Sequence, residues 1–524
     1  MTLHCAESPL RFADTDSASL ARAETATFRT NRTIQAILRP ETREQVQECV
    51  RAANGDGTRL YPISTGKNWG YGSSVPAADD CVLLDLSRLN RIVDFNERLG
   101  YVTVEPGVTQ RQLFTFLEAS KSRLWMDATG SSPDCSLIGN AVERGFGHTP
   151  YGDHFANVCG LEIVLPDGEI LRTGFAGLPD AKAGAVYRYG AGPSFDGLFS
   201  QSNFGIVTRM TIWLMPAPEY FQAYFFQSGA EGTLAGLIEA LRPLRMDGTL
   251  RSTVHIANDY KVLNGIQQFP DGETAPLSRL AMQGYRKKLK FGRWNGSGAL
   301  YGTRRQVAES RRLLRRALAG NVSRLQFLDD RTLNLAARFT RPYEWLTGLD
   351  LSRTLELVRP VFGLMKGVPT ETMLPSAYWR KSIPVPADPD PDRDGCGLIW
   401  CAPVAPADGG NVTEMVDIAE TTLLERGFEP MISLTMITER SVACVISIAY
   451  DRAVPGEDGK AISCYDELQR RLTAQGYYPY RLGIQSMDLL AADSARATFL
   501  NALKRAIDPN NILAPGRDVH GGAG

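Results

Sequence analysis

The chain has 524 residues, 43% of them hydrophobic, so it exceeds the size at which one hydrophobic core normally keeps growing, and we expect two or more packed units. Its 57 basic and 58 acidic side chains leave a net charge of only -1, which argues against the broad positive surface that a protein binding nucleic acid or an anionic membrane needs. The expected partner is therefore a small molecule.

The sequence shows no targeting or membrane-spanning pattern. The first twenty residues lack a basic start followed by an apolar core, and no run of about 18 apolar residues could cross a bilayer, so a soluble, cytoplasmic protein is expected. The nine cysteines are odd in number and never spaced as CxxC, so buried free thiols are expected. His148 and His154 lack a third metal ligand nearby, and no metal is expected.

The first 216 residues are predicted to alternate helices and strands. One helical face within residues 41–54 carries four apolar side chains, those of Val46, Cys49, Val50 and Ala53. Apolar runs predict strands at residues 59–64, 81–86 and 100–107, and helical spacing predicts a helix at residues 110–120.

A hairpin is the clearest local prediction. In residues 161–174, two apolar runs are joined by Pro166, Asp167 and Gly168, which are residues that tight turns favour. Antiparallel pairing is therefore expected there. The strand that begins at residue 205 ends in prolines 216 and 218, which lack the backbone donor of a strand, and we place the end of the first domain at residue 216.

Residues 217–481 are expected to form a second domain with longer amphipathic helices. One of these helices, at residues 304–320, has an arginine-rich face that we expect to be solvated. Alternating prolines in residues 383–395 exclude both a helix and a strand ladder. The final segment, residues 482–524, is too short to be a domain and is expected to pack back on the first one.

Three glycine-rich stretches are candidates for ligand binding. The first, STGKNWGYGSS at residues 64–74, could cradle a pyrophosphate with its backbone amides or could be an ordinary turn. It matches neither GxxxxGK[ST] nor GxGxxG. A second cluster at residues 136–155 and a third at residues 200–208 favour one extended ligand over an ordinary turn.

These stretches, together with LEIVLPDGEILRTG and the terminal DPNNILAPGR, resemble the flavoproteins of the vanillyl-alcohol oxidase and p-cresol methylhydroxylase family. The resemblance implies an α+β fold. It consists of a two-subdomain FAD-binding domain, formed by the N-terminal segment and the C-terminal tail, with an inserted α/β cap domain for the substrate. The residues that match the family's FAD site are Ser64, Thr65, Gly66, Lys67, Asn68, Gly70, Gly72, Ser73, Ser136, Gly139, Asn140, Gly145, Gly205, Ile206, Tyr378 and Arg517.

The family oxidises para-alkylphenols by removing a hydride from the benzylic carbon, which requires that the phenol be held as a phenolate. The resemblance implies that Tyr71, Tyr480 and Arg481 stabilise the phenolate oxygen. It also implies that Asp153 lies near flavin N5 and assists hydride transfer. The alternative for Asp153 is a helix or turn cap.

Family members tether the flavin covalently through histidine or tyrosine. Leu398 stands where the oxidase-type histidine would be, and Tyr378 resembles the tyrosyl site, so a covalent link through Tyr378 is predicted. The alternative is that Tyr378 is a core aromatic beside Trp379.

The sequence departs from the family where polar residues are expected to line the substrate pocket. Leucine, valine, alanine, cysteine and serine stand at these positions, which are Leu434, Val442, Ala443, Cys444 and Ser447. We expect a less polar pocket, and therefore another para-substituted phenol or another fate of the quinone methide.

The expected enzyme is a flavin-dependent 4-alkylphenol oxidase or dehydrogenase giving an alcohol, aldehyde or alkene. Its expected partners are a small phenol, oxygen or a cytochrome as electron acceptor, and further copies of the chain. Two alternatives remain open: a dehydrogenase of the same fold acting on a 2-hydroxy acid or sugar, and a noncatalytic scaffold.

Overall fold

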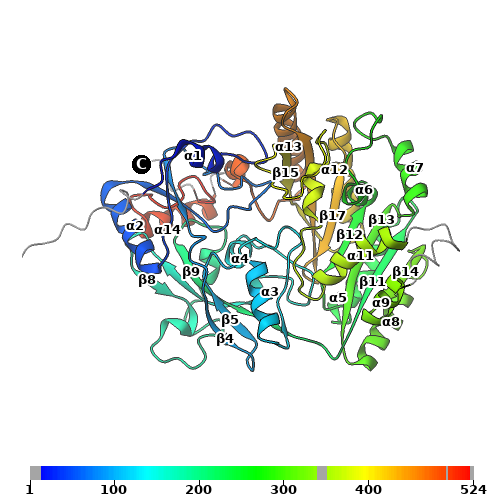
Figure 1. The fold of residues 1–524 in the computed structure, drawn as a ribbon, viewed down its shortest axis with the longest axis horizontal. Helices are drawn as coiled ribbons and strands as arrows, with labels where there is room; N and C mark the ends of the chain where they lie inside the picture. The colour runs from blue at the N-terminus through cyan, green and yellow to red at the C-terminus, as the bar shows by residue number, and fades with distance from the viewer. Residues whose placement is uncertain (1–12, 339–350, 491–493, 520–524) are drawn as a thin grey trace, which may run out of the picture.

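The computed structural model describes residues 13–338, 351–490 and 494–519. Two lobes lie side by side (Figure 1). The first lobe contains the N-terminal part of the chain together with helix α14, and the second contains the middle of the chain.

The first lobe is built on two larger sheets and a short strand pair. The parallel sheet has the order β1 (Ile34–Leu38), β3 (Cys81–Asp85), β2 (Arg59–Ile63). The antiparallel sheet has the order β4 (Ile92–Asn96), β5 (Tyr101–Val104), β9 (Ile206–Trp213), β7 (Val158–Val164), β8 (Ile170–Arg172). The strand pair consists of β10 (Met215–Pro216) and β6 (Leu124–Trp125).

Helices of the first lobe cover these sheets and position the loops. They are α1 (Ser17–Ala23), α2 (Arg43–Asp56), α3 (Gln110–Ala119), α4 (Leu137–Val142) and α14 (Ala495–Ile507), with 3-10 turns η2 (Phe155–Asn157), η3 (Gly174–Gly177) and η4 (Asp196–Phe199). Helix α2 confirms the predicted amphipathic helix, because the four predicted apolar side chains are its buried residues. It ends at Gly57, whose left-handed φ of 77° glycine adopts without strain.

The predicted hairpin is also confirmed. Strands β7 and β8 pair antiparallel, with Val164 opposite Ile170, and Gly168 in the turn has a φ of 80°. Strand β9 confirms the predicted strand before the prolines, and it pairs with both β5 and β7.

One large antiparallel sheet organises the second lobe. Its order is β14 (Arg324–Leu328), β11 (Tyr220–Ser228), β13 (Trp294–Gly302), β12 (Val254–Asn258), β17 (Met431–Met436), β18 (Ser441–Asp451), β15 (Cys396–Cys401), and β16 (Val404–Pro406) also pairs with β18. The helices are α5 (Leu234–Met246), α6 (Asp259–Ile266), α7 (Arg279–Leu289), α8 (Arg304–Leu318), α9 (Asp330–Arg338), α11 (Leu351–Leu364), α12 (Gly409–Glu425) and α13 (Glu457–Ala474), with the 3-10 turn η5 (Leu374–Tyr378). The 3-10 turn η6 (Ile484–Leu490) packs on the first lobe instead, against β1 and β2.

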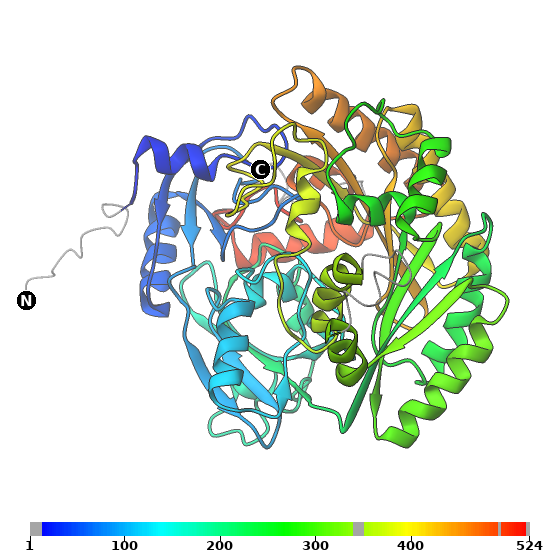
Figure 2. The same ribbon diagram turned by 45° about the vertical axis from the view of Figure 1, so that its right-hand side comes forward.

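The two faces of this sheet have different neighbours. Helices α5, α8, α12 and α13 pack on one face and form the largest hydrophobic core of the chain with it. Figure 2 shows helices along the outer side of the sheet and α11 on its inner side, toward the first lobe. Because side chains alternate along a strand, every second residue of β12, β17 and β18 faces the inner side.

The C-terminal segment, which includes α14, packs on the first lobe (Figure 1). The main-chain N–H of Leu60 donates to Ile512 at 2.7 Å, and that of Ala514 donates to Leu60 at 2.7 Å. The buried ammonium of Lys504 binds Asp508 at 2.7 Å and the carbonyl of Asn203 at 2.7 Å. The division at residues 216 and 481 itself stays a prediction.

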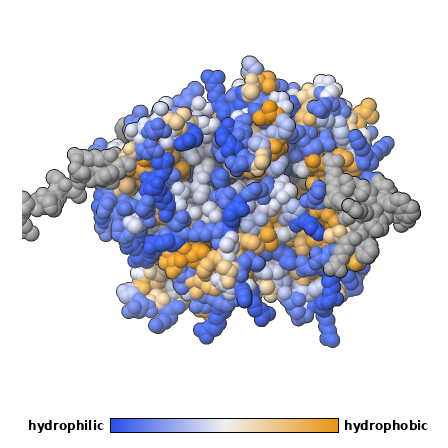
Figure 3. All heavy atoms as spheres, viewed as in Figure 1, coloured by the Kyte–Doolittle hydropathy of each residue, from blue (hydrophilic) through white to orange (hydrophobic). Residues whose placement is uncertain are grey.

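Several smaller expectations can be checked in the described residues. Residues 383–395 contain neither helix nor strand, as predicted. The eight described cysteines are buried and unbonded, and Cys5 lies outside the described residues. Within these residues, no helix is long and apolar enough to cross a membrane, and no cluster of metal-ligating side chains occurs. Hydrophilic residues predominate on the face in Figure 3, with separate hydrophobic patches.

Candidate active site

The first glycine stretch leaves strand β2 as a loop with unpaired backbone donors. Gly66, Gly70 and Gly72 have φ values of 69°, 76° and 121°, which side chains rarely allow. Tyr71 and Ser73 both donate their main-chain N–H groups to the carbonyl of Asn68. Among the described residues, the N–H groups of residues 65–69 donate to no protein acceptor. Consecutive free amides of this kind fit an anionic group.

Helix α4 lies against this loop. The Ser136 hydroxyl caps the helix by accepting from the N–H of Gly139 at 2.9 Å, and the N–H of Ser136 donates to the Thr65 hydroxyl at 3.2 Å. A Cβ atom added to Gly139 would lie only 2.4 Å from the Ser64 hydroxyl. The loop and the start of the second glycine cluster therefore form one cradle. Its free amides and close backbone approach fit the pyrophosphate of FAD.

Two further predicted cofactor residues, Gly205 and Ile206, lie at the start of strand β9. Ile206 belongs to the core beneath the cradle, with Leu60 and Leu513. A Cβ atom on the neighbouring Gly205 would meet Ile163. Strand packing alone therefore accounts for residues 205 and 206, and their contact with FAD stays a prediction.

The structure brings Tyr71, Tyr480 and Arg481 together. The Arg481 guanidinium lies over the Tyr71 ring, 4.3 Å from its centroid. The backbone of Tyr71 is held in place because its carbonyl accepts from the N–H of Ile484 at 3.0 Å. The backbone of Tyr480 is held by its own N–H, which donates to the carbonyl of Ala402 at 3.1 Å. Burial raises the pKa of both tyrosines, against the opposing effect of the Arg481 charge, so both hydroxyls stay protonated at neutral pH.

Glu143 holds the arginine in this position. Its carboxylate accepts from Arg481 Nε at 3.0 Å and also from Arg517. Burial tends to raise the pKa of Glu143, but the charges of Arg517 and Arg481 lower it below its ordinary value. Arg481 also donates to the Asn68 side chain at 2.6 Å, which joins it to the glycine loop. Glu143 lies inside a motif of the second cluster, but its two partners are more than 300 residues away in sequence, and no local pattern indicated its role.

Asp153 lies on a tight turn. The turn is closed by a bridge between Phe146 and Asp153. One Asp153 oxygen accepts from the N–H of Ala156 at 3.0 Å and so caps the turn that leads into the 3-10 helix η2. The capping alternative is therefore present in the structure, and a role of Asp153 at flavin N5 stays a prediction.

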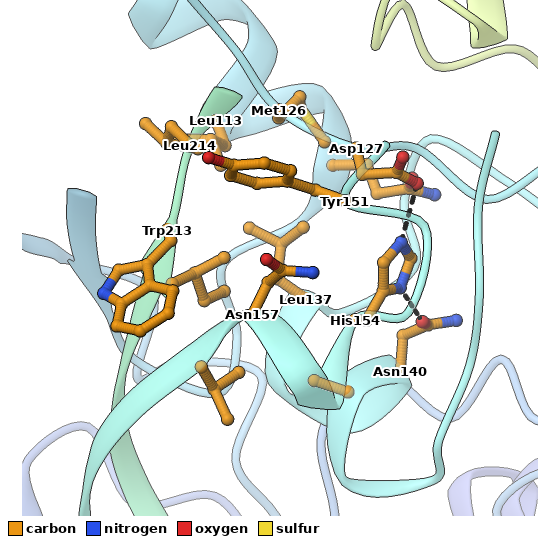
Figure 4. Close-up of a pocket in the computed structure, with 14 residues that line it drawn as sticks. Leu113, Met126, Asp127, Leu137, Asn140, Tyr151, His154, Asn157, Trp213 and Leu214 are labelled. Atoms are coloured by element: carbon orange, nitrogen blue, oxygen red, sulfur yellow. Dashed lines mark hydrogen bonds and ion pairs between the residues drawn. The ribbon is translucent and has the colours of Figure 1, made fainter. Parts of the chain in front are cut away.

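A buried network fixes this turn from the other side (Figure 4). His154 bonds Asp127 through Nε2 at 2.8 Å and Asn140 through Nδ1 at 2.5 Å. Burial tends to raise the pKa of Asp127, but the hydrogen bond and charge of His154 lower it. The adjoining cavity of about 30 Å³ holds roughly one or two waters and contains none of the three predicted phenolate ligands. We therefore interpret the cavity as part of the structure that supports the turn.

Tyr378 packs beside the glycine loop. It is fully buried in a cluster that includes Trp69 and Leu398, so both candidate attachment positions lie in the same place. Its hydroxyl donates to Asp394 at 2.5 Å. The pKa of Tyr378 is raised, mainly by burial and in second place by this hydrogen bond. Trp400 of the same cluster meets the Tyr71 ring edge to face at 5.5 Å. Trp400 thus links the Tyr378 cluster to Tyr71, one of the three predicted phenolate ligands, and a covalent link stays a prediction.

The positions predicted to change the substrate pocket divide between the two faces of the sheet. Leu434, Val442 and Cys444 pack in the core against the helices, so the prediction that they line the pocket is wrong. Ala443 and Ser447 point the other way, since they alternate with these residues along β18. Sequence alone could not assign the faces, because both are apolar.

Two histidines extend the inner face and were not predicted as a pair. The rings of His148 and His255 stack with centroids 4.2 Å apart, and Phe146 lies 6.3 Å from both His255 and Tyr480. Burial lowers the pKa of both histidines, most strongly that of His255. His255 is opposite Thr435, which is opposite Ala443. A row of ring contacts therefore runs from Tyr480 to the inner face of the sheet.

Comparison with known proteins identifies relatives of the whole chain. A family model for an FAD binding domain matches residues 34–174. The chain is 46% identical over 508 residues to 1'-carboxy-chondrochloren decarboxylase of Chondromyces crocatus, covering 96% of this chain and 94% of the relative. It is 31% identical over 493 residues to the flavoprotein subunit of the hydroxylating 4-cresol dehydrogenase of Pseudomonas putida, covering 92% and 87%.

A solved structure is similar to this chain over almost its whole length. The 4-ethylphenol oxidase from Gulosibacter chungangensis, in its isoeugenol complex, matches with a TM-score of 0.88 and 29% identity over 98% of this chain and 96% of that chain. The predicted α+β fold with FAD as cofactor is confirmed, and the protein is a flavin-dependent oxidoreductase. The chain belongs to the vanillyl-alcohol oxidase and p-cresol methylhydroxylase family of flavoproteins.

Proposed function

We propose that this protein removes a hydride from the benzylic carbon of a para-substituted phenol. The observation that carries the proposal is the convergence of Tyr71, Tyr480 and Arg481 next to the glycine loop. The names of the relatives support it, since two of them act on 4-cresol and 4-ethylphenol.

The three side chains suit the charge that this reaction requires. Loss of a hydride from an uncharged phenol would leave a benzylic cation, whereas loss from a phenolate gives a neutral quinone methide. Two protonated hydroxyls and one guanidinium can hold the phenolate oxygen by hydrogen bonds and charge. FAD, when bound, supplies the hydride acceptor.

A second candidate for the product-forming step is loss of carbon dioxide. It is favoured by the 46% identity to a protein named as a decarboxylase. In a substrate with a carboxylate one carbon beyond the benzylic position, the bond to the carboxylate breaks, and its electron pair forms the alkene and restores the aromatic phenolate. Without such a carboxylate, water addition or proton loss would give an alcohol or an alkene.

The electron acceptor and the assembly belong to the proposal too. One relative is named as an oxidase and another as the flavoprotein subunit of a dehydrogenase, so oxygen and a cytochrome are both candidates. We further propose a homo-oligomer and a cytoplasmic location.

Anaerobic titration of the purified holoenzyme tests the reaction. We expect 4-propylphenol to bleach the oxidised flavin absorption and D-lactate to leave it unchanged. Bleaching by the 2-hydroxy acid alone would favour the same-fold dehydrogenase. A colourless protein that takes up no FAD would favour a noncatalytic scaffold.

A further inference from the structure

Lys261 is a partly buried cation that has no anionic partner among the described residues. It lies in the first turn of α6, directly after β12. Its ammonium donates to the Asn264 side chain at 3.3 Å, and no carboxylate of the described residues lies within 4.0 Å of it. Burial alone lowers the pKa of Lys261 to about 8. An ammonium has three donors, so two of them lack a protein acceptor.

Two other lysines whose side chains are buried are each paired with a carboxylate. Lys504 binds the Asp508 carboxylate and two backbone carbonyls. Lys381 binds Asp451 at 2.7 Å and the carbonyl of Gly395. Removing an ammonium group from water costs free energy unless an anion compensates for the lost hydration. We therefore expect a lysine in such a place, without a protein carboxylate, to bind an anionic ligand. Lys261 is partly buried and keeps some accessible surface, as do His255 and Tyr480, so its free donors are open to a ligand.

Lys261 also lies at the inner face of the sheet, where the candidate active site is. Helix α6 contacts β12, β17 and η5, and Figure 1 shows α6 near β12 and β17. Asn264, the partner of Lys261, donates to the carbonyl of Ser376 at 2.8 Å. Ser376 belongs to the same turn as Tyr378, whose cluster includes Trp400, the neighbour of Tyr71. A series of contacts thus leads from Lys261 to Tyr71, one of the three proposed phenolate ligands.

We propose that Lys261 binds the carboxylate of a phenol whose para side chain ends in a carboxylate. This inference rests on the proposed function, because it assigns the other end of the same substrate. Phenolate held at one end and carboxylate at the other would fix the benzylic carbon between them. The cap domain thus contributes the group that selects acidic over neutral phenols.

The test compares two probes of the same shape, 3-(4-hydroxyphenyl)propanoate and its uncharged amide, with wild-type holoenzyme and the K261M, K261R and K287M variants. Dissociation constants are measured anaerobically from the flavin absorption change and independently by calorimetry. For K261M we expect the Kd of the acid to rise roughly 30-fold or more, with little change for the amide. K261R is expected to restore most of the affinity. K287M makes the same substitution at an exposed lysine of α7 and should match the wild type.

Three results would overturn the assignment: an equal loss of affinity for acid and amide, no loss for either, or a loss of FAD from K261M. The last would mean that Lys261 serves the cofactor's phosphates instead. Failure of the proposed function is distinguishable, because neither probe would then bleach the wild-type flavin. The calorimetric comparison would still decide whether Lys261 binds the carboxylate.

Discussion

Tyr480 is the most informative single side chain of the proposed site. Replacing it with phenylalanine removes one hydrogen-bond donor and little volume, so flavin reduction by 4-propylphenol should slow by about 10²- to 10³-fold. The rate is measured by anaerobic stopped-flow absorption at saturating phenol. Tyr478, two residues earlier and exposed, gives the matched control. Y478F should reduce as fast as the wild type, and equal rates for Y480F and Y478F would exclude Tyr480 from phenolate stabilisation.

Tyr378 is predicted to carry the flavin. Denatured wild-type protein should therefore have a mass that includes FAD, and the Y378F variant should have the mass of the polypeptide alone. The hydrogen bond to Asp394 provides a carboxylate that can accept the hydroxyl proton when the ether forms. Intact mass spectrometry after acid precipitation measures both masses. A wild-type mass without FAD would show that the flavin is bound noncovalently.

Lys261 gives binding of acidic phenols a defined pH dependence. Its pKa of about 8 is below the ordinary value, so the ammonium predominates below that pH and is progressively lost above it. Affinity for 3-(4-hydroxyphenyl)propanoate should therefore fall between about pH 8 and pH 9, while affinity for the amide should not follow this loss. Among the described residues, no titratable group of β12, β17 or η5 contributes to this pKa, and the contacting group, Asn264, does not titrate. Parallel pH curves for acid and amide, measured by calorimetry, would contradict the prediction.

At the level of single residues, the resemblance to the family indicated side chains that lie within its motifs, such as Tyr71 and Arg481. Glu143, Asp394 and Lys261 were not predicted. Their importance depends on partners that the fold brings together from distant parts of the chain, and Lys261 is distinguished by a partner that it lacks. Local spacing contains neither kind of information.

The contact between helix α4 and the glycine loop depends on the absence of one side chain. In G139A, the new Cβ atom would approach the Ser64 hydroxyl to 2.4 Å and the Ser136 side chain to 3.3 Å, so at least the Ser64 side chain has to move where the loop meets the helix. We expect the purified variant to contain less FAD, measured as the ratio of flavin to protein absorption. Gly284 in α7 has open space around it, and G284A should retain full FAD content. Equal FAD content in both variants would contradict the assigned cradle.

Secondary structure was most predictable where one pattern settled it. Helix α2 and the β7–β8 hairpin show this, because periodic apolar residues and a Pro-Asp-Gly turn each have one straightforward interpretation. The direction of side chains on β18 was not predictable. Both faces of that strand are buried, one against helices and one toward the first lobe. Polar and apolar residues therefore do not alternate along it, and the sequence does not show which side chains face the helices.

The first lobe is assembled from segments at opposite ends of the chain, and Lys504 joins them. In K504M, Asp508 would remain buried without its cation, and two carbonyls would lose their donor. The free energy of unfolding should fall by about 3 to 5 kcal/mol. Differential scanning fluorimetry of the holoenzyme measures this as a lower melting temperature. K287M, the same substitution at the surface, should melt with the wild type, and if K504M did so too the buried ion pair would not be what secures the C-terminal segment.

At the scale of the whole molecule, an FAD-binding part and a substrate-binding part were predicted only from the resemblance to the family. Composition indicated more than one unit, and the prolines after β9 indicated a break, but nothing local shows that residues 504–514 return to strand β2. Pairing between ends of a chain is decided by tertiary contacts, which a single sequence does not display.

The central claim is that a hydride leaves the benzylic carbon of a phenol held by Tyr71, Tyr480 and Arg481. Anaerobic flavin reduction by 4-propylphenol, compared with the same phenol deuterated at both benzylic positions, tests it most directly. The account predicts that deuterium slows flavin bleaching in the wild-type enzyme. Bleaching at the same rate with both phenols, or no bleaching with either, would contradict it.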